Sequence, residues 1–275
     1  MLRPSPIYVA ERFAPLRTSL LELLSALREA DWLRPTAAGE WTVKDVVAHL
    51  LGGDIGILSR RRDGFRPGGA IIDFQDLVKL VNRLNNEWVA AARRMSPRVL
   101  CDLLAHTGPQ VEAYLASLDP DAIGEPVGWA GPEPAPVWLD TAREFTERWH
   151  HQQQIRDATG QPPLYDPYFL SPVLAAFVRA LPRGFRHTEA PEGTVVRFEI
   201  TGDAGGVWFV ARSGGGWQLF VEVEPAPAAS VRIPQDAAWR MFTKGLDEAR
   251  ARASATIEGD AALAAPVFRT VSIIG

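Results

Sequence analysis

The spacing of apolar residues changes once along this chain, near residue 182, and no other feature of the sequence limits the fold as strongly. Before this point apolar residues recur at helical spacing, for example at Phe13, Leu16 and Leu20, and such a repeat is typical of amphipathic helices. After it, short segments alternate between apolar and polar residues, which predicts β-strands. We therefore predict an α+β protein of two domains, a helical bundle over residues 1–182 and a small α+β domain over residues 183–275.

Capping motifs and turn residues divide the first domain into segments. Thr42 and Asp45 have the spacing of a capping box, which marks the start of a helix. Gly160, followed closely by two prolines, marks the end of another. Helices are expected over residues 9–32, 42 to beyond 55, 73–95, 97–118, 137–159 and 169–181, with breaks at 35–40 and 67–69 and a long loop rich in proline and glycine over 119–136.

The second domain is expected to contain short strands joined by glycine-rich turns at 202–206 and 214–216. Strands are predicted over residues 195–200, 207–211, 217–223, 231–233 and 253–257, and helices over 235–242 and 260–274.

Composition and charge exclude several kinds of protein. The formal net charge of −4 over 275 residues gives no electrostatic basis for nucleic-acid binding, and no basic stretch is interleaved with aromatic residues. No apolar run approaches the ~20 residues needed to span a bilayer, and the first residues lack the apolar segment of a signal peptide. We therefore expect a cytoplasmic protein with neither nucleic acid nor membrane as a partner.

Three side chains are candidate metal ligands. Glu147 and His151 lie four residues apart in the helix predicted over 137–159, so they share one face of it. His49 lies about two turns into the helix that Thr42 opens. Two imidazoles and one carboxylate suit a divalent cation such as Zn²⁺, and three protein ligands leave a coordination position open for water or substrate. Charged and polar residues four apart are also common on solvated helix faces, and a solitary histidine in an apolar helix is often a core residue.

His150 is adjacent to the candidate ligand His151 but points elsewhere. Successive residues of a helix are rotated by about 100°, so both histidines cannot easily serve one ion. The spacing of four residues from Glu147 favours His151 as the ligand. His150 is then either an outer partner of the site or a surface residue.

Other reactive side chains have plainer explanations. His106 and His187 lie in polar segments, which predicts surface positions. Cys101, the only cysteine, rules out an intrachain disulfide or a thiolate cluster, and its leucine neighbours predict a buried small apolar residue. Arg240 and Lys244 either present positive charge to an anionic ligand or are solvated helix charges.

Two segments together resemble one known family. Residues 41–50 (WTVKDVVAHL) resemble the ligand-bearing second helix of the mycothiol-dependent maleylpyruvate isomerase family, whose members are relatives of the DinB-like helical bundles. Residues 147–151 (ERWHH), followed by 155–162 (IRDATGQP), resemble the second metal helix of that family and its exit. Residues 231–274 are similar to the sterol-carrier-like domain that these isomerases carry at the C-terminus, so the resemblance spans the chain.

The resemblance implies an up-down bundle in which His49, Glu147 and His151 bind Zn²⁺ or another divalent metal. It also implies mycothiol, or another low-molecular-weight thiol, as cosubstrate. The implied reaction is cis–trans isomerisation, or S-transfer, on a small electrophilic acid such as maleylpyruvate. In the isomerisation the thiolate adds to an activated cis double bond, and rotation and elimination give the trans isomer and return the thiol.

The sequence departs from this family at one position near the ligands. Many relatives have an aspartate three residues after the second ligand histidine, where this chain has Gln154. A neutral amide there is expected to orient the ligand more weakly than a carboxylate. An alternative function therefore stays open: a non-catalytic, metal-stabilised binding or regulatory protein whose C-terminal domain holds an apolar ligand or partner.

Overall fold

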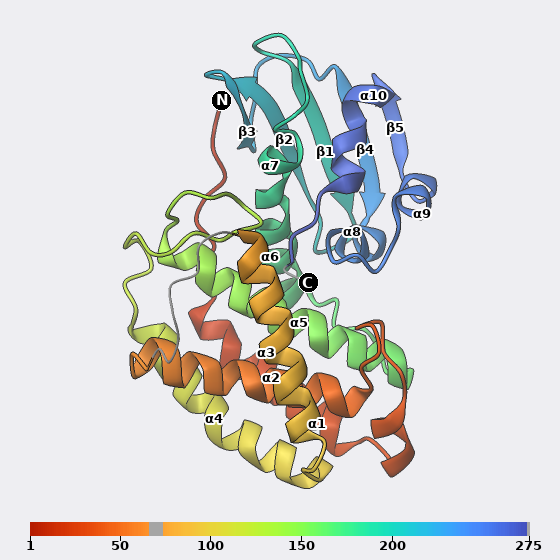
Figure 1. Ribbon diagram of the computed structural model, residues 1–275. Coiled ribbons are helices and arrows are strands. Elements are labelled where there is room, and N and C mark those ends of the chain that lie inside the picture. The colour runs from red at the N-terminus through yellow and green to blue at the C-terminus, as the bar shows by residue number, and fades with distance from the viewer. Residues whose placement is uncertain (66–73, 274–275) are drawn as a thin grey trace. The chain divides into compact units, whose positions relative to one another are not determined.

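The computed structural model describes residues 1–65 and 74–273, with no description of the side chains of residues 74–77 (Figure 1). Its contacts form two compact units. One, the helical unit, comprises residues 9–120 and 144–164; the other, the sheet unit, comprises residues 1–8, 121–143 and 165–274. The predicted α+β class is confirmed, whereas the domain boundary at residue 182 stays a prediction.

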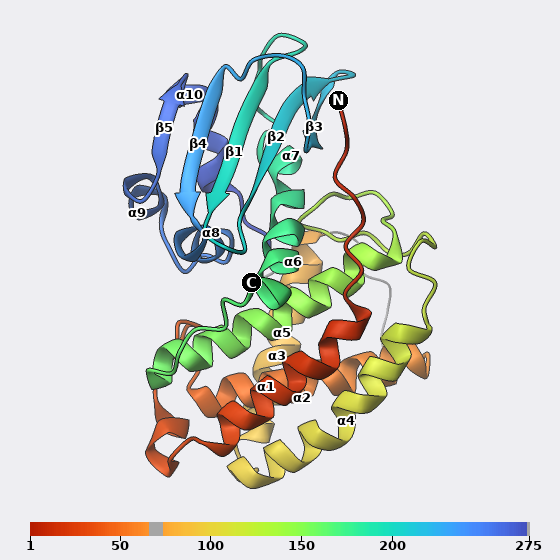
Figure 2. The same ribbon diagram turned by 180° about the vertical axis from the view of Figure 1, so that it is seen from behind.

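The helical unit is a bundle whose main helices pack around α2. The helices are α1 (Phe13–Ser25), α2 (Val43–Gly56), α3 (Phe74–Ala92), α4 (Pro97–Ser117) and α5 (Val137–Thr159), the last continuing from the sheet unit. Both α3 and α4 pack on α2, and α1 packs on α4. Figures 1 and 2 show α1, α2, α4 and α5 side by side. Their shared core is largely aliphatic and includes Leu24, Val47, Leu51, Leu100 and Ile155.

The first predicted helix is shorter than expected. The chain forms a 3₁₀ turn (Ala10–Arg12) and then α1, which ends at Ser25, and a separate 3₁₀ turn covers Glu29–Leu33. Arg28 is extended, with ψ of 159°, and its backbone N–H donates to the Asp31 carboxylate at 3.0 Å. Because this contact starts a new turn at Arg28, the apolar repeat that continues through Leu27 does not extend the helix.

The start of α2 agrees with the predicted capping box. The Asp45 N–H donates to Thr42 Oγ1 at 3.3 Å, and the Thr42 N–H donates to Asp45 Oδ2 at 3.1 Å. Gly52 does not interrupt the helix. A Cβ at this glycine would lie 2.6 Å from the Trp88 ring, so its lack of a side chain lets α3 approach α2 closely. A π-helical turn (Ile57–Arg62) follows α2. The predicted break at 67–69 and the predicted helix start at residue 73 lie outside the described residues.

The fourth and fifth helices agree with prediction. The loop over 119–136 contains neither helix nor strand, apart from an isolated bridge between Ile123 and Pro136. Gly160, with φ of 67°, ends α5 in the left-handed conformation that glycine adopts without strain.

The sheet unit is built on five strands in the order β3-β2-β1-β4-β5. They are β1 (Val195–Thr201), β2 (Gly206–Ser213), β3 (Gly216–Phe220), β4 (Ala229–Pro234) and β5 (Thr256–Gly259). The pair β1/β4 is parallel, and the other three pairs are antiparallel. In β1, Phe198 and Ile200 are buried, while Arg197 and Glu199 form an ion pair on the opposite face. The face with Phe198 and Ile200 therefore supplies core, and the opposite face carries this ion pair together with a smaller apolar cluster of Val195, Ala211 and Phe220.

Short helices cover the apolar face of this sheet, among them α7 (Leu181–Gly184) and α10 (Ala261–Ala264) (Figures 1 and 2). The sheet unit also contains α6 (Pro167–Phe177), α8 (Gln235–Phe242), α9 (Glu248–Ala253) and 3₁₀ turns at Val178–Ala180 and Ala265–Arg269. The helix predicted over 260–274 is wrong in length: helical structure ends at Arg269, and Thr270 is extended. Helix α9 was not predicted, and Ile274 lies outside the described residues.

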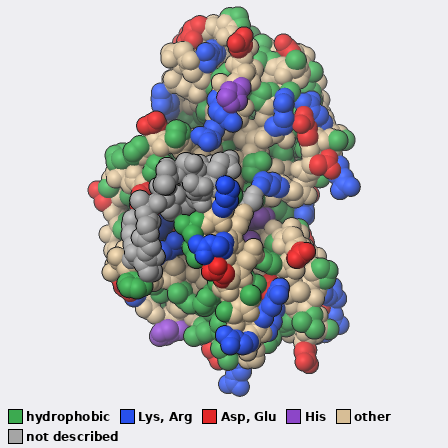
Figure 3. Space-filling view, in the orientation of Figure 1, with side chains coloured by type: hydrophobic (Ala, Val, Ile, Leu, Met, Phe, Trp, Pro, Cys, Tyr) green, Lys and Arg blue, Asp and Glu red, His purple; other side chains and the backbone are tan. Residues whose placement is uncertain are grey.

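Surface charge is mixed on the face drawn in Figure 3, where basic and acidic side chains are interspersed. Of the helices within residues 1–65 and 74–273, none combines the length and apolar character that crossing a membrane requires.

Candidate metal centre

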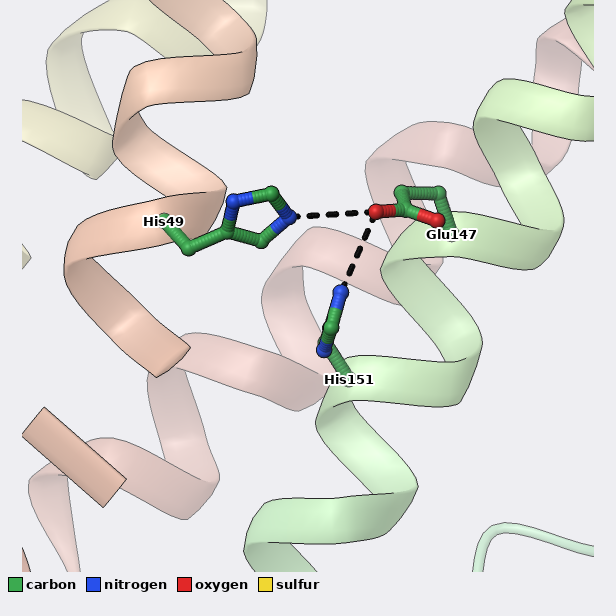
Figure 4. A group of neighbouring side chains, drawn as sticks. All are labelled: His49, Glu147 and His151. Atoms are coloured by element: carbon green, nitrogen blue, oxygen red, sulfur yellow. Dashed lines mark hydrogen bonds and ion pairs between the residues drawn. The ribbon is translucent and has the colours of Figure 1, made fainter. Parts of the chain in front are cut away.

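The structure brings the three predicted ligands together in the helical unit. His49 projects from α2, and Glu147 and His151 project from α5 (Figure 4). Glu147 Oε1 lies 3.1 Å from His49 Nε2 and 3.1 Å from His151 Nε2. One donor atom from each residue lies within 4.8 Å of the other two. The carboxylate therefore stands between two imidazoles that reach it from different helices.

Aromatic packing and a backbone hydrogen bond hold the His49 segment in place. The Trp41 ring lies against the His49 ring, with centroids 5.0 Å apart. Trp88 Nε1 donates to the carbonyl oxygen of Ala48 at 2.7 Å. Both contacts anchor the turn of α2 that carries His49, so the direction of this imidazole is set from two sides.

Gln154 controls the orientation of His151. His151 Nδ1 and Gln154 Oε1 are 2.8 Å apart, and both side chains are buried. An amide oxygen only accepts hydrogen bonds, so Nδ1 must carry the proton in this contact. In the neutral imidazole the lone pair is then on Nε2, the atom that faces Glu147. Metal-bound histidines generally donate their second ring N–H in this manner, and here the residue flagged as a departure from the family supplies the acceptor.

The three groups shift one another's pKa values. Burial acts to raise the pKa of Glu147, but His151 and His49 outweigh it and hold that pKa well below its usual range. Burial acts to lower the pKa of His151, yet Glu147 and Gln154 raise it overall. Burial dominates at His49 and lowers its pKa despite the hydrogen bond to Glu147. The site therefore favours an ionised Glu147, a neutral His49, and a His151 that keeps its second ring proton to higher pH than an ordinary histidine.

The donor set fits a divalent cation. Zinc–nitrogen and zinc–oxygen bonds are about 2.0–2.2 Å long, so two donors on one ion are at most about 4.2 Å apart. Both separations of 3.1 Å between Glu147 and the histidines satisfy this limit, and the three donor atoms all lie within 4.8 Å of one another. Within the described parts of the chain, the donor group around Glu147 consists of three residues. Cation binding itself stays a prediction.

The centre is accessible on the side of the carboxylate. The Glu147 side chain is 35% exposed, whereas those of His49 and His151 are 12% and 9% exposed. A small molecule from solvent would thus meet the centre at Glu147 while the imidazoles stay shielded.

The structure also locates the other histidines considered. His150 is buried, and its ring stacks on that of His151 with centroids 5.2 Å apart. Of its two predicted positions, the surface one is wrong. His106 and His187 are exposed, as predicted.

Two further candidates, Cys101 and Arg240, make contacts within the protein. Cys101 is half-buried beside the apolar core, and burial followed by the charge of Asp102 raises the pKa of its thiol. That shift disfavours the nucleophilic thiolate. Arg240 pairs with Asp236 at 3.1 Å and lies over the Trp239 ring.

A buried charged network, which the sequence did not predict, lies next to the centre. Arg148 Nη2 contacts Asp54 Oδ1 at 2.8 Å, and Arg148 Nη1 contacts Glu144 Oε2 at 2.9 Å. Thr107 Oγ1 donates to Asp54 Oδ2 at 2.8 Å. The only sequence signal for it was that Asp54 lies in an apolar helix segment, between Leu51 and Ile57, where a charged residue needs a partner.

A helical bundle that brings two histidines and a glutamate together defines a class of protein: bundles with a three-donor centre suited to a divalent cation. Residues 13–156, just over half of the chain and including all three donors, match the family described as the mycothiol maleylpyruvate isomerase N-terminal domain. The chain belongs to this family.

Comparison with solved structures shows the same fold. The crystal structures of the mycothiol-dependent maleylpyruvate isomerase and of a histidine-to-alanine mutant of it each align with a TM-score of 0.53 and 13% sequence identity. Each alignment covers 86% of this chain and 88% of the isomerase. The comparison with curated proteins finds no significant match.

Proposed function

We propose that this protein is a divalent-metal-dependent enzyme that uses a low-molecular-weight thiol of the mycothiol type. Its reaction is cis–trans isomerisation, or S-transfer, on a small electrophilic acid such as maleylpyruvate. Family membership supports the thiol and the reaction class. The observation that carries the proposal is the convergence of three donors, one of them the partly exposed Glu147 carboxylate, because a three-ligand centre keeps a position for a reactant.

His49 Nε2, Glu147 Oε1 and His151 Nε2 would hold the cation, and Zn²⁺ suits this set of nitrogen and oxygen donors. When bound, the cation supplies positive charge that turns a ligating thiol into its thiolate. Gln154 keeps the Nδ1 proton on His151, so that Nε2 faces the centre. Glu147 contributes the one negative charge of the set, and its pKa ensures that this charge is present at neutral pH.

The isomerisation needs no further reactant. The thiol sulfur adds to one carbon of the cis double bond, the remaining single bond rotates, and elimination of the sulfur restores the double bond in the trans form. The thiol returns unchanged. Cys101 is unsuited to replace the external thiol because burial raises its pKa and disfavours the thiolate.

Metal analysis tests the ligands. Purified wild-type protein is expected to bind one equivalent of Zn²⁺, and His49→Ala and Glu147→Ala are expected to lose it. His106→Ala is the matched control, since His106 is an exposed histidine of the same helical unit. Stoichiometric metal in both ligand variants would refute the assignment of these donors.

A thiol assay tests the function. Metal-loaded protein is incubated with mycothiol and maleylpyruvate, and NMR follows the conversion of the cis to the trans acid and the formation of any S-conjugate. We expect turnover that depends on both the thiol and the metal. Metal-loaded protein that neither binds a small thiol nor acts on the acid would contradict the proposal and favour a non-catalytic role.

A further inference from the structure

We propose that Asp54 and Arg148 are positioning residues that set the register between α2 and α5, and so the distance from His49 to Glu147. This inference rests on the proposed metal centre and extends it to residues that do not touch the cation. It concerns a pair of side chains from the same two helices that supply the ligands.

The pair links the ligand helices next to the ligands themselves. Arg148 directly follows Glu147 on α5, and Asp54 lies five residues after His49 on α2. Their side chains meet at 2.8 Å and are only 16% and 6% exposed. Any slide of α2 along α5 would therefore stretch this contact together with the 3.1 Å contact between His49 and Glu147.

Neighbouring side chains fix both members of the pair. Thr107 on α4 donates to the second carboxylate oxygen of Asp54 at 2.8 Å. Glu144, one turn before Arg148, accepts from Arg148 Nη1 at 2.9 Å. With each charged group held by a further partner, the link between the helices has one geometry rather than many.

Stability alone does not account for a buried ion pair here. Removing two charges from water is costly, and well-packed apolar residues of similar volume often stabilise a protein equally or better. Charged groups differ from apolar ones in how well they fix the relative position of two helices, because hydrogen bonds are directional and apolar contacts are not.

Packing beside the pair is incomplete. A cavity of about 40 Å³ is bounded by Asp54, Arg148, Leu50, Leu104 and Gln152, among others. Close packing normally prevents neighbouring helices from shifting, and this constraint is weaker where a cavity adjoins α2 and α5. A shift of one helical residue is about 1.5 Å, enough to disrupt a three-donor centre. The Asp54–Arg148 pair supplies the constraint that packing lacks beside this cavity.

The test separates stability from metal geometry. The double variant Asp54→Leu with Arg148→Met removes both charges and leaves no unpaired partner within the pair. We expect the apo protein to keep its helical circular dichroism, with a lower melting temperature because the buried Glu144 carboxylate loses its 2.9 Å contact with Arg148. Its affinity for Zn²⁺, measured by competition with a chromophoric chelator, should fall about tenfold to hundredfold. The visible spectrum of the Co²⁺-loaded variant should also change, which a purely structural role would not cause.

The chain offers a matched control. Arg17 and Glu112 form an ion pair at 2.6 Å between α1 and α4, in the wall of the same cavity. Neither helix carries a ligand. Arg17→Met with Glu112→Leu should therefore leave the Zn²⁺ affinity and the Co²⁺ spectrum unchanged, whatever its effect on stability.

Each outcome decides the inference. Unchanged Zn²⁺ affinity and Co²⁺ spectrum in the Asp54/Arg148 variant would overturn it, as would an equal loss in the Arg17/Glu112 variant. If the double variant does not fold, Asp54→Asn, which keeps the shape and loses the charge, is measured instead: its Zn²⁺ affinity should fall and its Co²⁺ spectrum should change, and wild-type values for both would overturn the inference. Wild-type protein that binds no Zn²⁺ would overturn the proposed function first and this inference with it, so the two failures are distinguishable.

Discussion

Replacing Gln154 by leucine removes the acceptor for His151 Nδ1, a contact of 2.8 Å between two buried side chains. A buried donor left without a partner costs about 1–3 kcal/mol. The apo protein can avoid part of this cost by moving the proton to Nε2, where Glu147 accepts it. The metal-bound protein cannot, because Nε2 then holds the cation. The cost therefore falls mainly on the bound state.

At about 1.4 kcal/mol for each tenfold change in affinity, this cost corresponds to a Zn²⁺ affinity about fivefold to a hundredfold weaker. Competition against a chromophoric chelator at fixed pH measures the difference directly. Gln154→Glu keeps an acceptor and adds charge, so it should bind Zn²⁺ at least as tightly as wild type.

Gln153→Leu is the control for this experiment. Gln153 is buried on the same helix, accepts from the Leu164 N–H at 3.0 Å and donates to Asp157 at 3.1 Å, with no contact to the donor group. We expect it to lower stability and leave Zn²⁺ affinity unchanged. Wild-type affinity in Gln154→Leu, or an equal loss in Gln153→Leu, would refute the reasoning.

Three further outcomes are expected. The pKa of His151 is raised above its ordinary value, so Zn²⁺ must displace a proton to bind. The affinity of the protein for Zn²⁺ should therefore increase as pH rises through that pKa, and the calorimetric heat of binding should vary with the ionisation enthalpy of the buffer. Cys101→Ser should leave thiol-dependent turnover unchanged, and a large loss of turnover would contradict the structural role of this thiol. Burial and the hydrogen bond to Asp236 raise the pKa of Tyr165 to about 12. The stability linked to this shift is fully present below about pH 10 and is lost as pH rises towards about 12. Urea unfolding of Tyr165→Phe should therefore lack this loss of stability between about pH 10 and 12.

Local chemistry made much of the helical part predictable. The start of α2 follows from hydrogen bonds between Thr42 and Asp45, three residues apart, and the end of α5 follows from Gly160. Two helices were predicted to be longer than they are, and in both cases the cause is a local change of backbone conformation. The apolar repeat through Leu27 hid the extended backbone at Arg28, and the apolar residues after Asp260 did not reveal that the chain becomes extended at Thr270.

The sequence by itself determined that Glu147 and His151 share one helix face, because the geometry of an α-helix places residues four apart side by side. Only the tertiary structure decided that His49, 98 residues before Glu147, meets the same oxygen atom. It also decided that Gln154 turns towards His151 and that Arg148 finds Asp54, 94 residues away. Contacts between distant segments depend on how the helices pack, and apolar periodicity specifies which face is buried without specifying which side chain lies opposite.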